Sequence, residues 1–132
     1  MKSINGNDVA YNVYIPKEAV FNIVSPGELF DKLSILEIKK ERGLKVEKEY
    51  NELFLFLKDY ISKITAIYDL LLASNKSQWD LEDKIRVEQN LDDVGRFALL
   101  IREYNVTRVE LKNKINDKLK LGYQEKKDYK RG

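Results

Sequence analysis

The sequence contains no cysteine and no histidine. Without cysteine the chain has no disulfide framework, no thiolate nucleophile and no cysteine zinc site. Without histidine it has no imidazole base or metal ligand, so a Ser-His-Asp triad is excluded. The remaining reactive groups are carboxylates, lysine, arginine and tyrosine. Any bound metal would therefore be a hard ion held by oxygen, and Mg²⁺ is the ion that we expect.

Long apolar runs are also missing. No stretch approaches the roughly 20 apolar residues that a membrane-spanning helix needs, so we expect no membrane partner. Residues 1–6 lack the apolar core of a signal peptide. We therefore expect the protein to work in the cytoplasm.

The overall composition is that of one globular domain. Of the 132 residues, 43% are hydrophobic and 35% are charged, which suits a real core surrounded by charged helix faces. We expect a single domain over residues 1–132. It would consist of an extended arm over residues 1–24, a helical bundle over residues 25–121 and a polar tail over residues 122–132.

Hydrophobic periodicity predicts an all-α bundle of about four helices with a short extended arm. Alternating apolar residues between Val9 and Ile15 predict a short β-strand in the arm, and residues 21–24 predict a second. Gly43 is the expected end of the first helix, and Ser77 is the expected N-cap of the third. Gly95 would weaken or bend that third helix. The helices are expected over residues 26–42, 44–73, 77–98 and 105–120, with a loop at residues 74–76.

The first of these helices has two apolar faces instead of one. One face is formed by Leu29, Leu33 and Leu36, and the nearly opposite face by Ile35 and Ile38. Such a helix is expected to be covered on both sides by other elements. Asp31 lies between Ile35 and Ile38 on the helical wheel, and a covered carboxylate needs a partner. The sequence therefore predicts a buried charged centre around this helix.

Charged and amide residues at helical spacing supply the candidates for a site. Acidic residues on two helices have the oxygens that Mg²⁺ prefers, and basic or amide residues beside them would suit a phosphate. The candidate metal ligands are Glu28, Asp31, Glu82 and Asp83. The candidate ligand-binding residues are Lys32, Lys39, Arg86, Asn105, Arg108, Lys112 and Asn116. No catalytic residue can be assigned from the sequence.

Four ordered motifs resemble those of a family of short, uncharacterised bacterial and phage proteins. The first is S-x-G-E-x-x-D-K-x-x-I-L-x-I-K-x-x-R from Ser25, and the second is W-x-x-E-D-x-I-R from Trp79. The third is N-x-x-R-x-x-x-K-x-x-I-N from Asn105, and the fourth is E-x-K-x-Y from Glu125. The chain departs from the family pattern at Val106, Asn113 and Lys126. The resemblance implies no known reaction, but its positions are largely the charged residues selected above.

Two functions of different classes follow from these patterns. The first is binding of a small phosphate-bearing anion, such as a nucleotide or sugar nucleotide, with Mg²⁺ as a possible cofactor. The alternative is a non-enzymatic helical interaction module in which the charged motifs are structural ion pairs. Apolar residues on several faces of the 44–73 helix and an unpaired strand in the arm predict a homo-oligomer, most simply a dimer.

Nucleic-acid binding is a weaker third alternative. Residues 106–132 carry nine Lys and Arg against four Asp and Glu, so the C-terminal end is basic. No aromatic or glycine-rich nucleic-acid module accompanies these charges. A solvated helix and tail explains them more simply.

Overall fold

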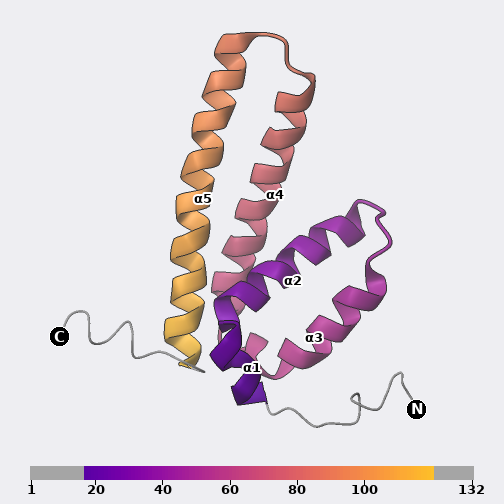
Figure 1. Cartoon of the computed structure of the whole chain (residues 1–132), viewed down its shortest axis with the longest axis vertical. Helices are drawn as coiled ribbons and strands as arrows, with labels where there is room; N and C mark the ends of the chain where they lie inside the picture. The colour runs from indigo at the N-terminus through magenta and orange to yellow at the C-terminus, as the bar shows by residue number, and fades with distance from the viewer. Residues whose placement is uncertain (1–16, 121–132) are drawn as a thin grey trace, which may run out of the picture. The chain divides into compact units, whose positions relative to one another are not determined.

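The computed structural model describes residues 17–120, and these residues form an all-α structure of five helices (Figure 1). The all-α prediction is thus confirmed. The helices are α1 (Lys17–Ile23), α2 (Pro26–Glu41), α3 (Glu47–Ile61), α4 (Thr65–Val87) and α5 (Leu91–Leu119). The chain divides into two units: α1 belongs to one, and the other, Pro26–Lys120, contains α2 to α5.

The second strand expected at residues 21–24 is wrong, because α1 already covers Phe21 to Ile23. A run of four residues is too short for its apolar pattern to separate a strand from a helical turn. The first expected strand, Val9 to Ile15, and the expected polar tail both lie outside the described residues.

The ends of α2 agree with the sequence prediction. The helix begins at Pro26 and ends at Glu41. Gly43 follows with a φ of 85°, a left-handed conformation that favours glycine. The N–H of Leu44 then donates to the carbonyl of Lys39 at 3.0 Å, which closes the end of the helix.

The helix predicted over residues 44–73 is in fact two helices, α3 and α4, which are separated at residues 62–64. The apolar heptad spacing continues across the break, since Leu57, Ile64 and Leu71 are all buried. Periodicity alone therefore could not locate the break. The loop expected at residues 74–76 is wrong as well, because α4 continues through it to Val87.

The later helix ends also differ from those predicted from the sequence. Ser77 lies inside α4 and is not an N-cap, while Gly95 lies inside α5 without ending it. The true cap is Asn90, whose side chain accepts a hydrogen bond from the N–H of Asp93 at 3.1 Å. The helix expected from residue 105 is therefore the second half of α5.

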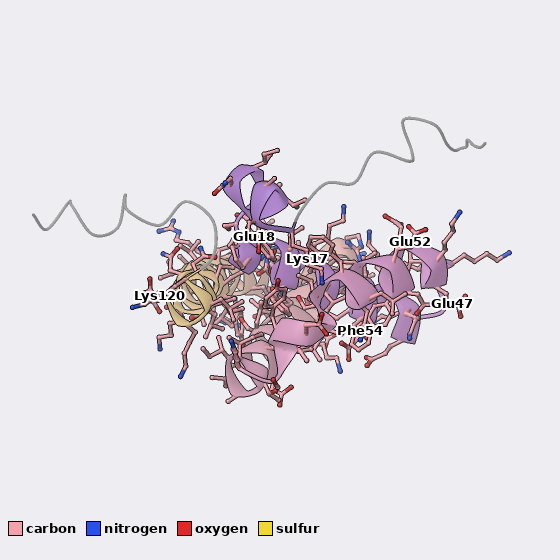
Figure 2. The ribbon with its side chains drawn as sticks, turned by 90° about the horizontal axis from the view of Figure 1, so that it is seen from below. Lys17, Glu18, Glu47, Glu52, Phe54 and Lys120 are labelled. Carbon is pink, nitrogen blue, oxygen red and sulfur yellow. The ribbon has the colours of Figure 1, made fainter. Side chains whose placement is uncertain are left out.

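Within the Pro26–Lys120 unit, α4 and α5 lie side by side as a long hairpin, and α2 packs against both (Figure 1). The helix α3 packs against α2 and turns charged side chains such as Glu47 and Glu52 outward (Figure 2). The ends of α4 and α5 nearest to residues 88–90 extend beyond α2 and α3. The fully buried core includes Phe30, Leu33, Ile38, Leu57, Leu71 and Ile115.

The double-faced character predicted for α2 is confirmed. Half of its residues are buried, and they face three different helices. None of the helices in the described part of the chain is both long and apolar enough to cross a membrane.

Candidate functional site

Asp31 is the buried carboxylate at the centre of the unit, and only 5% of the residue is exposed. Arg108 of α5 binds it through two parallel hydrogen bonds. Its Nε donates to Oδ1 at 2.9 Å, and its Nη2 donates to Oδ2 at 2.6 Å. The side-chain amide of Asn75 in α4 adds a third donor to Oδ1 at 3.0 Å. The predicted cationic partner of Asp31 is therefore present, and it joins α2 to α5.

Asn75 connects this ion pair to the backbone of α2. Its Nδ2 also donates to the hydroxyl of Ser34 at 2.7 Å, and that hydroxyl donates to the carbonyl of Asp31 at 2.7 Å. Asn75 is 3% exposed and Ser34 is fully buried. A polar network in such a setting specifies one packing arrangement because each donor has a defined acceptor.

The first turn of α2 lies directly against α5. The N–H of Gly27 donates to Oδ1 of Asn116 at 2.7 Å, which gives one of the free N–H groups at the helix start an acceptor. A Cβ at Gly27 would lie 2.3 Å from the carbonyl oxygen of Lys112. Close approach therefore requires glycine here. Glu28 belongs to the same turn of α2, and its Oε2 lies 2.9 Å from Nζ of Lys112 in α5.

The charge of Arg108 is stabilised by its surroundings. The hydrogen bonds to Asp31 raise the pKa of Arg108, and the charges of Asp31, Glu28 and Glu82 raise it further, while burial opposes them. Arg108 is therefore a permanent cation that is already neutralised by a carboxylate.

A cavity of about 160 Å³ adjoins the ion pair. It is lined by Ile35, Asn75, Gln78, Trp79, Glu82 and Arg108. Two buried amide oxygens among these residues, Oδ1 of Asn75 and Oε1 of Gln78, have no hydrogen-bond partner.

A second charged cluster lies at the other end of α2. Arg42 contacts Asp80 at 2.7 Å and Asp83 at 3.4 Å, and its guanidinium stands 5.4 Å from the ring centre of Trp79. Asp83 also pairs with Arg86 one turn along α4. These side chains are exposed or half-exposed, so the cluster contributes little to stability on its own.

The predicted site residues thus do not all lie together. Residues Glu28, Asp31, Arg108, Lys112 and Asn116 meet between α2 and α5, with Glu82 nearby at the cavity. Asp83 and Arg86 belong to the cluster around Arg42. Lys32 lines a hollow between α2 and α3, while Asn105 is exposed on α5 and Lys39 is half-buried on α2. Neither Asn105 nor Lys39 is among the residues that line the cavity.

The four candidate metal ligands do not gather at one point. Over residues 17–120, no group of three or more acidic side chains lies close enough together to hold a metal ion. Glu28 and Asp31 are instead each paired with a base from α5.

Sequence reasoning missed Asn75, Ser34 and Gln78. The sequence predicts a loop at Ser74 and Asn75, because serine and asparagine favour turns. The available signal was the spacing of Leu71, Asn75 and Gln78, which places the two amides on the same helix face as a core leucine.

Comparisons with family models, with curated proteins and with solved structures found no match for this chain.

Proposed function

We propose that this protein is a non-enzymatic helical interaction module whose charged motifs are structural ion pairs. The observation that carries the proposal is the pairing of α2 with α5. Asp31 is bound by Arg108, and Glu28, one turn earlier, is bound by Lys112. Two acids about one turn apart on α2 thus meet two bases about one turn apart on α5.

The geometry of the pairs supports a structural role. A two-point arginine–carboxylate contact fixes both distance and orientation. Removing one member of a buried pair leaves an uncompensated charge and is strongly destabilising, whereas the intact pair specifies one arrangement. Gly27 adds to this specificity, because its backbone contacts α5 directly.

Binding of a phosphate-bearing anion with Mg²⁺ has less support. Arg108 and Lys112, the two bases that reach the centre, are already occupied by carboxylates. An incoming phosphate would have to break these pairs and leave Asp31 buried and unpaired, at a cost of several kcal/mol.

The surface of the α4–α5 hairpin supports an interaction role. A hollow of about 300 Å³ between the two helices has Leu70 and Ala73 of α4 and Tyr104 and Leu111 of α5 in its walls. A second hollow shares Tyr104 with the first and extends to Leu100. We call the two together the hairpin groove. We propose that it receives the hairpin of a second copy, since two such hairpins can bury their apolar faces as a four-helix assembly.

The test is the mass of the protein by light scattering at micromolar concentration. We expect twice the single-chain mass of 15.5 kDa for the wild type. Leu70→Glu should shift the protein toward the single-chain mass, because it places a charge on the wall of the hairpin groove. Leu55→Glu on α3 is the matched control, since both leucines are 60% exposed and only Leu70 lines the groove.

A wild-type mass of 15.5 kDa would contradict self-association. Equal dissociation by Leu70→Glu and Leu55→Glu would contradict the role of the hairpin groove.

A further inference from the structure

The cavity between α2, α4 and α5 is rich in hydrogen-bond acceptors. Asn75 Oδ1 and Gln78 Oε1 are both buried without a donor, and both residues line the cavity. A buried acceptor without a donor has lost its hydrogen bonds to water and gained none in the protein, which costs free energy. Native structures contain few such groups, and a ligand is one reason for their presence.

The orientation of both amides follows from their neighbours. Asn75 Nδ2 donates to the carboxylate of Asp31 at 3.0 Å, and Gln78 Nε2 faces the carboxylate of Glu82 at 3.4 Å. An ionised carboxylate only accepts hydrogen bonds, so the nitrogen must face it in each case. Exchanging oxygen and nitrogen would therefore not satisfy the two free oxygens.

The charges around the cavity sum to an excess of one negative charge. The cation of Arg108 is neutralised by Asp31, which leaves the carboxylate of Glu82. The indole of Trp79 forms another part of the wall, and the guanidinium of Arg42 already stands 5.4 Å from the centre of its ring. This excess of negative charge favours a positively charged donor over an anion in the cavity.

We propose that this cavity binds the primary ammonium group of a small aliphatic amine. An ammonium group has three N–H donors, and the cavity offers three acceptors: Asn75 Oδ1, Gln78 Oε1 and the carboxylate of Glu82. The methylene groups of the amine lie against Trp79 and Ile35. This site is separate from the hairpin groove and does not depend on self-association.

The size of the cavity limits the ligand. Its volume of about 160 Å³ is close to that of an apolar protein cavity of ~150 Å³ that holds benzene. A linear diamine with a chain of four or five carbons fits this volume with one end inside. Glu82 is exposed, so the second ammonium group can remain in water at the mouth.

The test uses the fluorescence of Trp79, which is the single tryptophan of the chain. The full-length protein is titrated with 1,4-diaminobutane at constant ionic strength, and with 1,4-butanediol as the neutral molecule of equal length. We expect a saturable change in emission and a higher melting temperature with the diamine at millimolar concentration. The diol should produce neither.

Three variants locate the site. Glu82→Gln and Gln78→Leu should each weaken diamine binding at least tenfold, because the first removes the negative charge that faces the ammonium group and the second removes one of its acceptors. Asp69→Asn, an exposed carboxylate on the same helix that does not line the cavity, should bind like the wild type. Melting of each variant without ligand shows whether it is folded as the wild type is.

Each other outcome would overturn the proposal. Absence of a saturable change would mean that the cavity holds water only. Equal binding of diol and diamine would mean that the cavity does not select an ammonium group over a hydroxyl group. If Asp69→Asn and Glu82→Gln weaken diamine binding equally, the binding reflects the negative charges of α4 in general and not the cavity.

Discussion

Gly27 and Gly95 are both helical glycines, but a methyl group would meet different surroundings at each. At Gly27 it would lie 2.3 Å from the backbone carbonyl oxygen of Lys112 in α5. At Gly95 it would meet nothing within 4 Å. The same substitution therefore tests packing at one position and helix propensity at the other.

We expect Gly27→Ala to lower the free energy of unfolding by about 1–3 kcal/mol, because α2 must move away from α5. Gly95→Ala should raise it by about 0.5–1 kcal/mol, because alanine loses less backbone entropy in a helix. Urea unfolding of both variants measures the two changes. A neutral Gly27→Ala would mean that α2 and α5 are not in close contact.

Tyr68 gives a prediction for pH dependence. Its hydroxyl donates to Oε1 of Glu37 at 2.7 Å. Burial raises the pKa of Tyr68, and the hydrogen bond to Glu37 and the charge of Glu37 raise it further. The folded state thus holds the phenolic proton more tightly than the unfolded state, in which the pKa is about 10.

The contribution of this proton to stability is complete below about pH 10, and it is lost as the pH rises through the raised pKa of the folded state. Tyr68→Phe has no such proton. We expect the wild type to be more stable than Tyr68→Phe by about 1.5–3 kcal/mol near neutral pH. Urea unfolding at increasing pH should show this difference shrinking above about pH 10. A constant difference would be incompatible with the raised pKa.

Part of this residue-level picture could be predicted from the sequence. The apolar neighbours of Asp31 on the helical wheel indicated burial and a cationic partner, which Arg108 provides. Asn75 could not be predicted in the same way. Its local preference is for turns. Its place inside a helix is explained by its contacts with α2, where its partner Asp31 lies 44 residues earlier in the chain.

At the level of elements, helix ends are where sequence and structure differ most. Ser77 has the residue type of an N-cap and lies in the middle of α4. Asn90 is the residue that caps α5. Both positions are preceded by polar residues and followed by an apolar pattern, so local chemistry alone did not separate them.

Alanine substitution distinguishes the two positions. Asn90→Ala should lower the free energy of unfolding by about 1 kcal/mol, because the N–H of Asp93 loses its acceptor. Ser77→Ala should leave it unchanged or raise it slightly, because alanine is the better helix former. Thermal or urea unfolding provides the measurement. A larger loss of stability for Ser77→Ala than for Asn90→Ala would instead support a helix that begins at Ser77.

The extent of helix could be predicted because the 3.6-residue period is strong along most of the chain. The break between α3 and α4 could not, because Leu57, Ile64 and Leu71 keep the period across it. A turn that preserves the spacing of the buried residues leaves no trace in the pattern.

At the level of the whole unit, two clusters of charge join the α2 segment to the α4–α5 hairpin. One is the buried network of Asp31, Asn75 and Arg108, and the other is the exposed contact of Arg42 with Asp80. Their different burial implies that the first is the stronger. Asp31 and Arg108 could be selected from the sequence, but their pairing depends on how α2 crosses the hairpin, which no local pattern encodes.

The Asp31–Arg108 pair tests most directly whether the charged motifs hold the fold together, as we propose. The measurement is a double-mutant cycle by urea unfolding with Asp31→Asn, Arg108→Met and the double variant. We expect each single change to cost about 3 kcal/mol, at the lower end of the range for buried pairs because the Arg108 side chain is 29% exposed. The double variant should cost less than the sum by about 1–3 kcal/mol. If Arg108→Met instead leaves stability unchanged or raises it, the arginine is held in place for a ligand and the structural role is wrong.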